Sequence, residues 1–91
     1  MRKVSEILRQ RREEKDLDLD SVSRETKIKR EFLEAIEEGR FQSLPSESHA
    51  LGFAKIYAKY LGINAQTIVP LFRREYKSYH VPIVPEFRKT Q

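Results

Sequence analysis

Apolar residues recur along most of this chain at steps of three and four, the spacing that places side chains on one face of a helix. Val4, Ile7 and Leu8 have this spacing near the N-terminus. Leu33 and Ile36 repeat it further along. No segment alternates apolar and polar residues as a half-buried strand would. The pattern predicts an all-α fold.

Boundary signals divide this pattern into five segments. Asp18 and Ser46 stand where a side-chain oxygen can cap the start of a helix. Gly39 and Gly62 stand where a residue without a β-carbon can adopt a positive φ and end one. The predicted helices cover residues 3–15, 19–26, 29–38, 47–61 and 65–78.

The length of 91 residues allows one domain with a single core. We expect residues 1–79 to form a five-helix bundle, with Phe41 in the core and Pro70 kinking or interrupting the last helix. Residues 80–91 contain two prolines and mixed charge, which predicts an irregular linker or tail.

Composition argues against an enzyme and a metal protein. The chain has no cysteine, which excludes a disulfide, a thiolate zinc site and a cysteine nucleophile. Its two histidines, His49 and His80, have no carboxylates at ligand spacing. We therefore expect no catalytic residue, cofactor, metal or small-molecule substrate. No apolar stretch approaches the ~18 residues of a membrane span, and residues 1–6 do not lead into the apolar core of a signal peptide, so we expect a soluble cytoplasmic chain.

Positive charge is concentrated in the second half of the chain. The net charge is +4 and the pI about 9.5, values that suggest nucleic acid or an anionic membrane as partner. Residues 1–45 are neutral overall, and the excess lies mainly in Arg73, Arg74, Lys77, Arg88 and Lys89. The excess positive charge therefore lies outside the segment that would have to contact the DNA bases.

That segment is a helix-turn-helix unit, indicated by two short helices with a tight turn between them at residues 26–28. A DNA-reading unit presents donors from its second helix to base edges between two rows of phosphates. The outward charged residues predicted there are Lys29, Arg30, Glu31, Glu34, Glu37 and Glu38. Their net charge of −2 would repel the phosphates, which argues against nucleic acid as a partner.

The predicted helix 47–61 carries more apolar surface than one buried face requires. A small aliphatic sector suits close packing, and an aromatic sector beside it contains Phe53, Ile56, Tyr57 and Tyr60, with His49 at its edge. Together they span about 220°, against roughly 100° for an ordinary surface helix. Either this helix is central and wholly covered, or part of the aromatic sector is a recognition surface.

Three segments resemble the cytoplasmic domain of the RodZ family of bacterial cell-shape proteins. Residues 8–15 are similar to its first helix and residues 26–39 to its third. The most specific likeness is residues 52–62, Gly-Phe-Ala-Lys-Ile-Tyr-Ala-Lys-Tyr-Leu-Gly, which resemble its fourth helix. The resemblance covers about residues 3–76.

The resemblance implies a domain that binds filaments of the actin homologue MreB at the cytoplasmic face of the inner membrane. Family members continue into a transmembrane helix that is absent from this sequence. The family's aromatic contact residues correspond to Phe53 and Tyr57, with His49 one turn earlier, so the anchor pair is either His49/Phe53 or Phe53/Tyr57. We favour Phe53/Tyr57, with Ile56 or Tyr60 in the core.

Two functions are compatible with these residues. The first is a filament adaptor, in which Lys55 and Lys59 pair with acidic residues of MreB beside the aromatic anchors. The alternative is a DNA-binding transcriptional regulator that uses the helix-turn-helix. Binding to phosphates would weaken steeply with salt, whereas aromatic docking would not.

Overall fold

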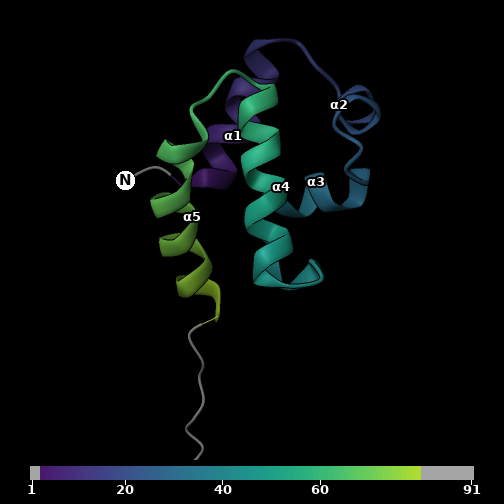
Figure 1. The fold of residues 1–91 in the computed structure, drawn as a ribbon. Coiled ribbons are helices and arrows are strands. Elements are labelled where there is room, and N and C mark those ends of the chain that lie inside the picture. Colours follow the sequence, from purple (N-terminus) through teal and green to yellow (C-terminus); the bar gives the residue numbers. More distant parts are fainter. Residues whose placement is uncertain (1–2, 81–91) are drawn as a thin grey trace, which may run out of the picture.

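Five α-helices and one short 3₁₀ helix follow one another along the described part of the chain (Figure 1). The computed structural model describes residues 3–80, and no strand occurs among them. The elements are α1 (Val4–Glu14), α2 (Leu19–Thr26), α3 (Arg30–Glu38), the short 3₁₀ helix η1 (Phe41–Ser43), α4 (Glu47–Tyr60) and α5 (Ala65–His80). The predicted all-α, five-helix fold is confirmed. Of the predicted tail, residues 80–91, the structure describes only His80, which ends α5 instead of belonging to an irregular segment, and the rest lies outside the described residues.

The boundary signals act as the sequence predicts. Asp18 Oδ1 accepts a hydrogen bond from the Ser21 backbone N–H at 2.7 Å, which starts α2 and lowers the pKa of Asp18. Ser46 Oγ accepts one from the His49 N–H at 3.1 Å and starts α4. Gly39 follows α3 with a φ of 72°, in the left-handed region where a β-carbon would be strained.

Pro70 does not interrupt α5, contrary to part of the expectation. The helix runs unbroken from Ala65 to His80. Pro70 lies near the N-terminus of α5 on its exposed side, and the carbonyl it leaves without a helical donor belongs to the exposed Gln66. Water can solvate that carbonyl, so the helix loses one internal hydrogen bond and continues.

The turn between α2 and α3 is held by side chains. Lys27 ends α2 with a φ of 66°, a conformation that usually falls to glycine. Thr26 Oγ1 accepts a hydrogen bond from the Ile28 N–H at 3.3 Å, and Ser23 Oγ donates to the Ile28 carbonyl at 2.6 Å. These bonds fix the geometry of the helix-turn-helix despite the strained lysine.

α4 is the central helix of the bundle. α5 packs along one side of it, and α2 and α3 lie on the other (Figure 1). Ala50, Ala54 and Ala58 are fully buried, so small side chains let the neighbouring helices approach α4 closely. Phe41, from η1, packs on Phe72 of α5 with 5.1 Å between ring centroids, as expected for a core residue.

The two ends of the described chain are joined by a buried carboxylate. Glu75 of α5 is 5% exposed and accepts hydrogen bonds from the Ser5 backbone N–H at 3.3 Å and from Ser5 Oγ at 2.9 Å. The N–H groups of the first helical turn lack partners within their own helix. Glu75 therefore caps α1 from a distance and ties α5 to it.

Candidate partner-binding surface

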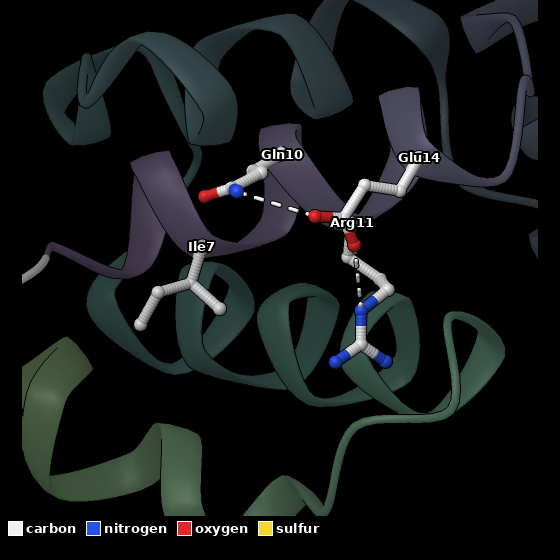
Figure 2. A pocket seen from close by; sticks show the side chains of 4 residues that line it. All are labelled: Ile7, Gln10, Arg11 and Glu14. Carbon is white, nitrogen blue, oxygen red and sulfur yellow. Dashed lines mark hydrogen bonds and ion pairs between the residues drawn. The ribbon is translucent and has the colours of Figure 1, made fainter.

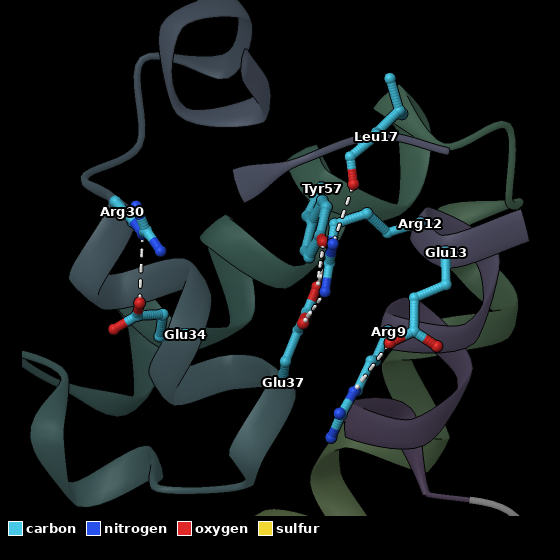
Figure 3. A network of polar contacts seen from close by, with 8 residues as sticks. All are labelled: Arg9, Arg12, Glu13, Leu17, Arg30, Glu34, Glu37 and Tyr57. Atoms are coloured by element: carbon cyan, nitrogen blue, oxygen red, sulfur yellow. Dashed lines mark hydrogen bonds and ion pairs between the residues drawn. The ribbon is translucent and has the colours of Figure 1, made fainter. Parts of the chain in front are cut away.

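A polar network lies between α1, α3 and α4, with Glu37 at its centre (Figure 3). Arg12 binds the Glu37 carboxylate in a bidentate manner, with N–O distances of 2.7 and 3.0 Å. A third nitrogen of Arg12 donates to the Leu17 carbonyl at 2.8 Å. The Tyr57 hydroxyl donates to Glu37 as well. Removing one member of a buried, bidentate ion pair typically costs about 3–5 kcal/mol.

Glu37 thus occupies a different place from the one expected. It was predicted to face outward from the third helix, but its side chain is only 5% exposed. Its position four residues after the buried Leu33 places it on the inward side of α3, a signal that the sequence already contained. The carboxylate is satisfied by Arg12 and Tyr57 and belongs to the core.

Tyr57 is therefore no surface anchor, and the favoured pair Phe53/Tyr57 was wrong. Its side chain is fully buried. Burial, followed by the hydrogen bond to Glu37 and the negative charge of that carboxylate, raises the pKa of Tyr57 above the ordinary tyrosine value. An aromatic ring enclosed by the bundle and bonded through its hydroxyl cannot enter a groove on a partner.

Ile56 and Tyr60, one of which was expected in the core, are both exposed. Their exposed fractions are 47% and 37%, the highest among the large apolar side chains of the described residues. At 100° per residue they fall on the same side of α4 as His49, Gly52 and Phe53, within an arc of about 100°. We call these five residues, His49, Gly52, Phe53, Ile56 and Tyr60, the α4 stripe.

The α4 stripe is partly preorganised. Phe53 is half-buried and stacks on Phe32 of α3, with 5.4 Å between ring centroids. The ring centroids of His49 and Phe53 are 6.0 Å apart. His49 Nδ1 is 2.8 Å from the Ser46 hydroxyl that caps α4. The remaining candidate pair, His49/Phe53, thus reaches solvent and is held by neighbours, as contact residues should be.

Lys55 and Lys59 lie beside the α4 stripe, on the flank that contains Gly52 and Ile56. Both are exposed, as the sequence suggested, and neither has an acidic partner among residues 3–80. An apolar strip with cations along one edge is complementary to a partner surface that has an apolar groove with acidic residues along one side.

The helix-turn-helix face is electrostatically different. Arg30 is paired with Glu34 at 3.1 Å (Figure 3). It is also paired with Asp20 at 2.9 Å, and these two acids raise its pKa. Glu31 and Glu38 are exposed on the same helix. A DNA phosphate would have to displace the two carboxylates from Arg30 and approach further negative charge. Both effects disfavour DNA binding at the helix-turn-helix face.

A small hollow on α1 is lined by side chains that pair with one another (Figure 2). Gln10 Nε2 donates to Glu14 Oε2 at 3.2 Å, and Arg11 Nε lies 3.6 Å from Glu14 Oε1. Arg11 also donates to the Leu61 carbonyl at 3.4 Å. The polar groups of this hollow already have partners, and its volume of about 90 Å³ is far below the ~300 Å³ of small ligand pockets.

Ile56, Gly52 and Tyr60 were not predicted as contact residues. The sequence signal for Ile56 and Tyr60 is their spacing from His49. Ile56 follows His49 by seven residues and Tyr60 follows it by eleven, so His49, Ile56 and Tyr60 lie on the same side of a helix. The sequence contained this spacing. It did not indicate which edge of the wide apolar arc the other helices cover.

Comparison with known proteins agrees with the helix-turn-helix fold. Residues 7–68 match a family described as a helix-turn-helix domain. The chain belongs to this helix-turn-helix family. The match begins within α1 and ends within α5, so it includes the helix-turn-helix and all of α4.

Two relatives of this helix-turn-helix family member are described as membrane proteins. The chain is 29% identical over 65 residues to the uncharacterized membrane protein YmfM of Bacillus subtilis (strain 168). That match covers 70% of this chain and 23% of the relative. A solved structure of YmfM from Staphylococcus aureus, a "putative DNA-binding membrane protein", superposes with a TM-score of 0.77 at 32% identity. It covers 81% of this chain and 90% of that structure.

Among residues 3–80, no helix has both the length and the apolar character needed to span a bilayer.

Proposed function

We propose that this domain is a non-enzymatic adaptor that binds MreB filaments through the α4 stripe and serves cell-shape maintenance. The observation that carries the proposal is an exposed apolar strip on the central helix, bordered by two lysines that have no acidic partners among residues 3–80. Aromatic and large aliphatic side chains are preferred anchors at protein interfaces. The resemblance of residues 52–62 to the RodZ fourth helix supports MreB as the partner.

The place of action that we propose is the cytoplasmic face of the bacterial inner membrane. Two relatives are described as membrane proteins, and the matched segment is less than a quarter of one of them. A domain of this kind would link filaments to the membrane as one part of a longer, anchored protein. Many copies on one filament would strengthen an interface that is weak for each copy.

Co-sedimentation with polymerised MreB tests the proposal. We expect the wild-type domain to pellet with filaments and the double variant Phe53→Ala/Ile56→Ala to remain in solution. Leu19→Ala, which truncates another half-buried apolar side chain on α2, is the matched control and should pellet normally. Helical content is checked by circular dichroism, so that lost binding is not mistaken for unfolding.

Reversing the charge of the two lysines provides a second test of filament binding. Lys55→Glu/Lys59→Glu should weaken pelleting, because it places acids against the acidic edge expected on the filament. Lys15→Glu/Lys27→Glu changes the net charge equally at exposed positions away from the α4 stripe and should not. Equal pelleting by wild type, the apolar double variant and both charge variants would refute the proposal.

DNA binding through the helix-turn-helix is the second candidate, favoured by the description of the S. aureus relative. Affinity for duplex DNA would then fall linearly with salt on a logarithmic scale, with a slope set by the number of phosphates contacted. Filament binding through an apolar strip would change little over the same range. Measuring both at low and physiological salt separates the two functions.

A further inference from the structure

Gly52 lies in the middle of α4, where glycine is unfavourable. Glycine inside a helix is about 0.5–1 kcal/mol less favourable than alanine, because it loses more backbone freedom on folding. Two reasons normally explain such a residue: a backbone conformation closed to other residues, or a close neighbour that leaves no room for a β-carbon.

Neither reason exists within the described chain. Gly52 lies within a regular α-helix and, unlike Gly62, does not have a positive φ. Apart from its two chain neighbours and the adjoining backbone of α4, a β-carbon built on Gly52 would meet no atom within 4 Å. The position is open space on the outside of the bundle.

The open space is a shallow hollow in the α4 stripe. It has a volume of about 250 Å³ and is lined by Ser48, His49, Gly52, Phe53 and Ile56. This is smaller than the ~300–1,000 Å³ of small-molecule sites and is lined mainly by apolar atoms. A hollow of this size is suited to a single side chain of a protein partner.

We infer that Gly52 is the point of closest approach in the filament interface, where one bulky apolar side chain of MreB rests on the α4 backbone between His49 and Ile56. This role rests on the proposed function and adds a specificity-determining residue to it. A β-carbon at position 52 would occupy the hollow and hold the partner away from Phe53 and Ile56.

Substitutions of Gly52 should therefore have opposite effects on stability and binding. Gly52→Ala should raise the melting temperature by about 2–8 °C, because alanine favours the helix and meets no neighbour. The same substitution should weaken filament binding, and Gly52→Leu should weaken it by about tenfold or more, because overpacking an interface is unfavourable. A variant that is more stable yet binds less cannot have lost affinity through unfolding.

Thr67→Ala is the matched control, since it also raises helix propensity but lies at an exposed position on α5. It should stabilise the domain and leave filament binding unchanged. Wild type, both Gly52 variants and Thr67→Ala are compared by co-sedimentation and thermal melts. Equal binding by wild type and Gly52→Leu overturns the role of Gly52 alone, and so does a lower melting temperature for Gly52→Ala. Failure of wild type to pellet overturns both the role and the filament function.

Discussion

At the scale of single residues, the burial of Tyr57 and the exposure of Ile56 are the reverse of what their side chains suggest. The tyrosine has the polar tip and large ring typical of an interface anchor, yet it is buried with its hydroxyl on Glu37. The isoleucine is the ordinary core residue, yet it is about half exposed. Glu37 accounts for the burial of Tyr57, because a buried hydroxyl is stable where it has an acceptor.

Tyr57 gives a prediction about alkaline pH. Its pKa is raised in the folded state, so the stability that its protonated form contributes is complete below the unfolded value of about 10 and is lost as the pH rises above it. We expect one of the four tyrosines to ionise only together with unfolding. Ultraviolet absorbance of the phenolate, recorded beside circular dichroism, measures both events.

The control for this titration is Tyr57→Phe. It removes the late ionising group and should lower the free energy of unfolding by about 1.5–3 kcal/mol, since the lost hydrogen bond is made to a charged acceptor. If Tyr57 ionises near pH 10 while the helices remain intact, the burial assigned to it is incorrect.

At the scale of elements, the helix ends follow local signals and the helix faces do not. Residues 47–61 were predicted as a helix and α4 covers Glu47–Tyr60. The cap Ser46 and the stop near Gly62 lie within a few residues of the bonds they control, so a sequence suffices to place them. The apolar arc of about 220° on the same helix has no equivalent local marker of its buried centre.

Ser46 carries the prediction for this scale. Ser46→Ala removes the hydroxyl that caps α4 and should lower the free energy of unfolding by about 0.5–2 kcal/mol. Urea unfolding followed by circular dichroism measures the change. Ser48→Ala, two residues further on at an exposed helical position, should have a much smaller effect. Equal effects of the two substitutions would show that the cap is not important.

At the scale of the whole molecule, two polar contacts between helices far apart in the sequence, which we call the polar ties, make the stability of one helix depend on another. Arg12 and Glu37 join α1 to α3 across 25 residues, and Ser5 and Glu75 join α1 to α5 across 70. Neither tie could be predicted from spacing, because each depends on how remote helices pack. Both acids are buried, so each tie removes a carboxylate from the exposed surface that a sequence-based charge count assumes.

Glu75 provides the prediction for this scale. Glu75→Ala leaves the Ser5 hydroxyl and N–H without their acceptor and should cost about 1–3 kcal/mol, the usual penalty for an unsatisfied buried group. Hydrogen exchange should accelerate most in the first turn of α1, although the substitution is on α5. Lys77→Ala, on an exposed position of the same helix, should leave that turn protected.

The sequence by itself determined the all-α class, the five helices with their caps and stops, and the choice of the fourth helix as the candidate surface. These depend on periodicity and on hydrogen bonds between residues a few positions apart. Only the tertiary structure decided that Tyr57 is covered while Ile56 and Tyr60 are exposed. The physical reason is that burial depends on which remote helices pack on a face. Here the helices on the two sides of α4 cover the part of its apolar arc that contains Ala54, Tyr57 and Ala58, and leave Ile56 and Tyr60 exposed.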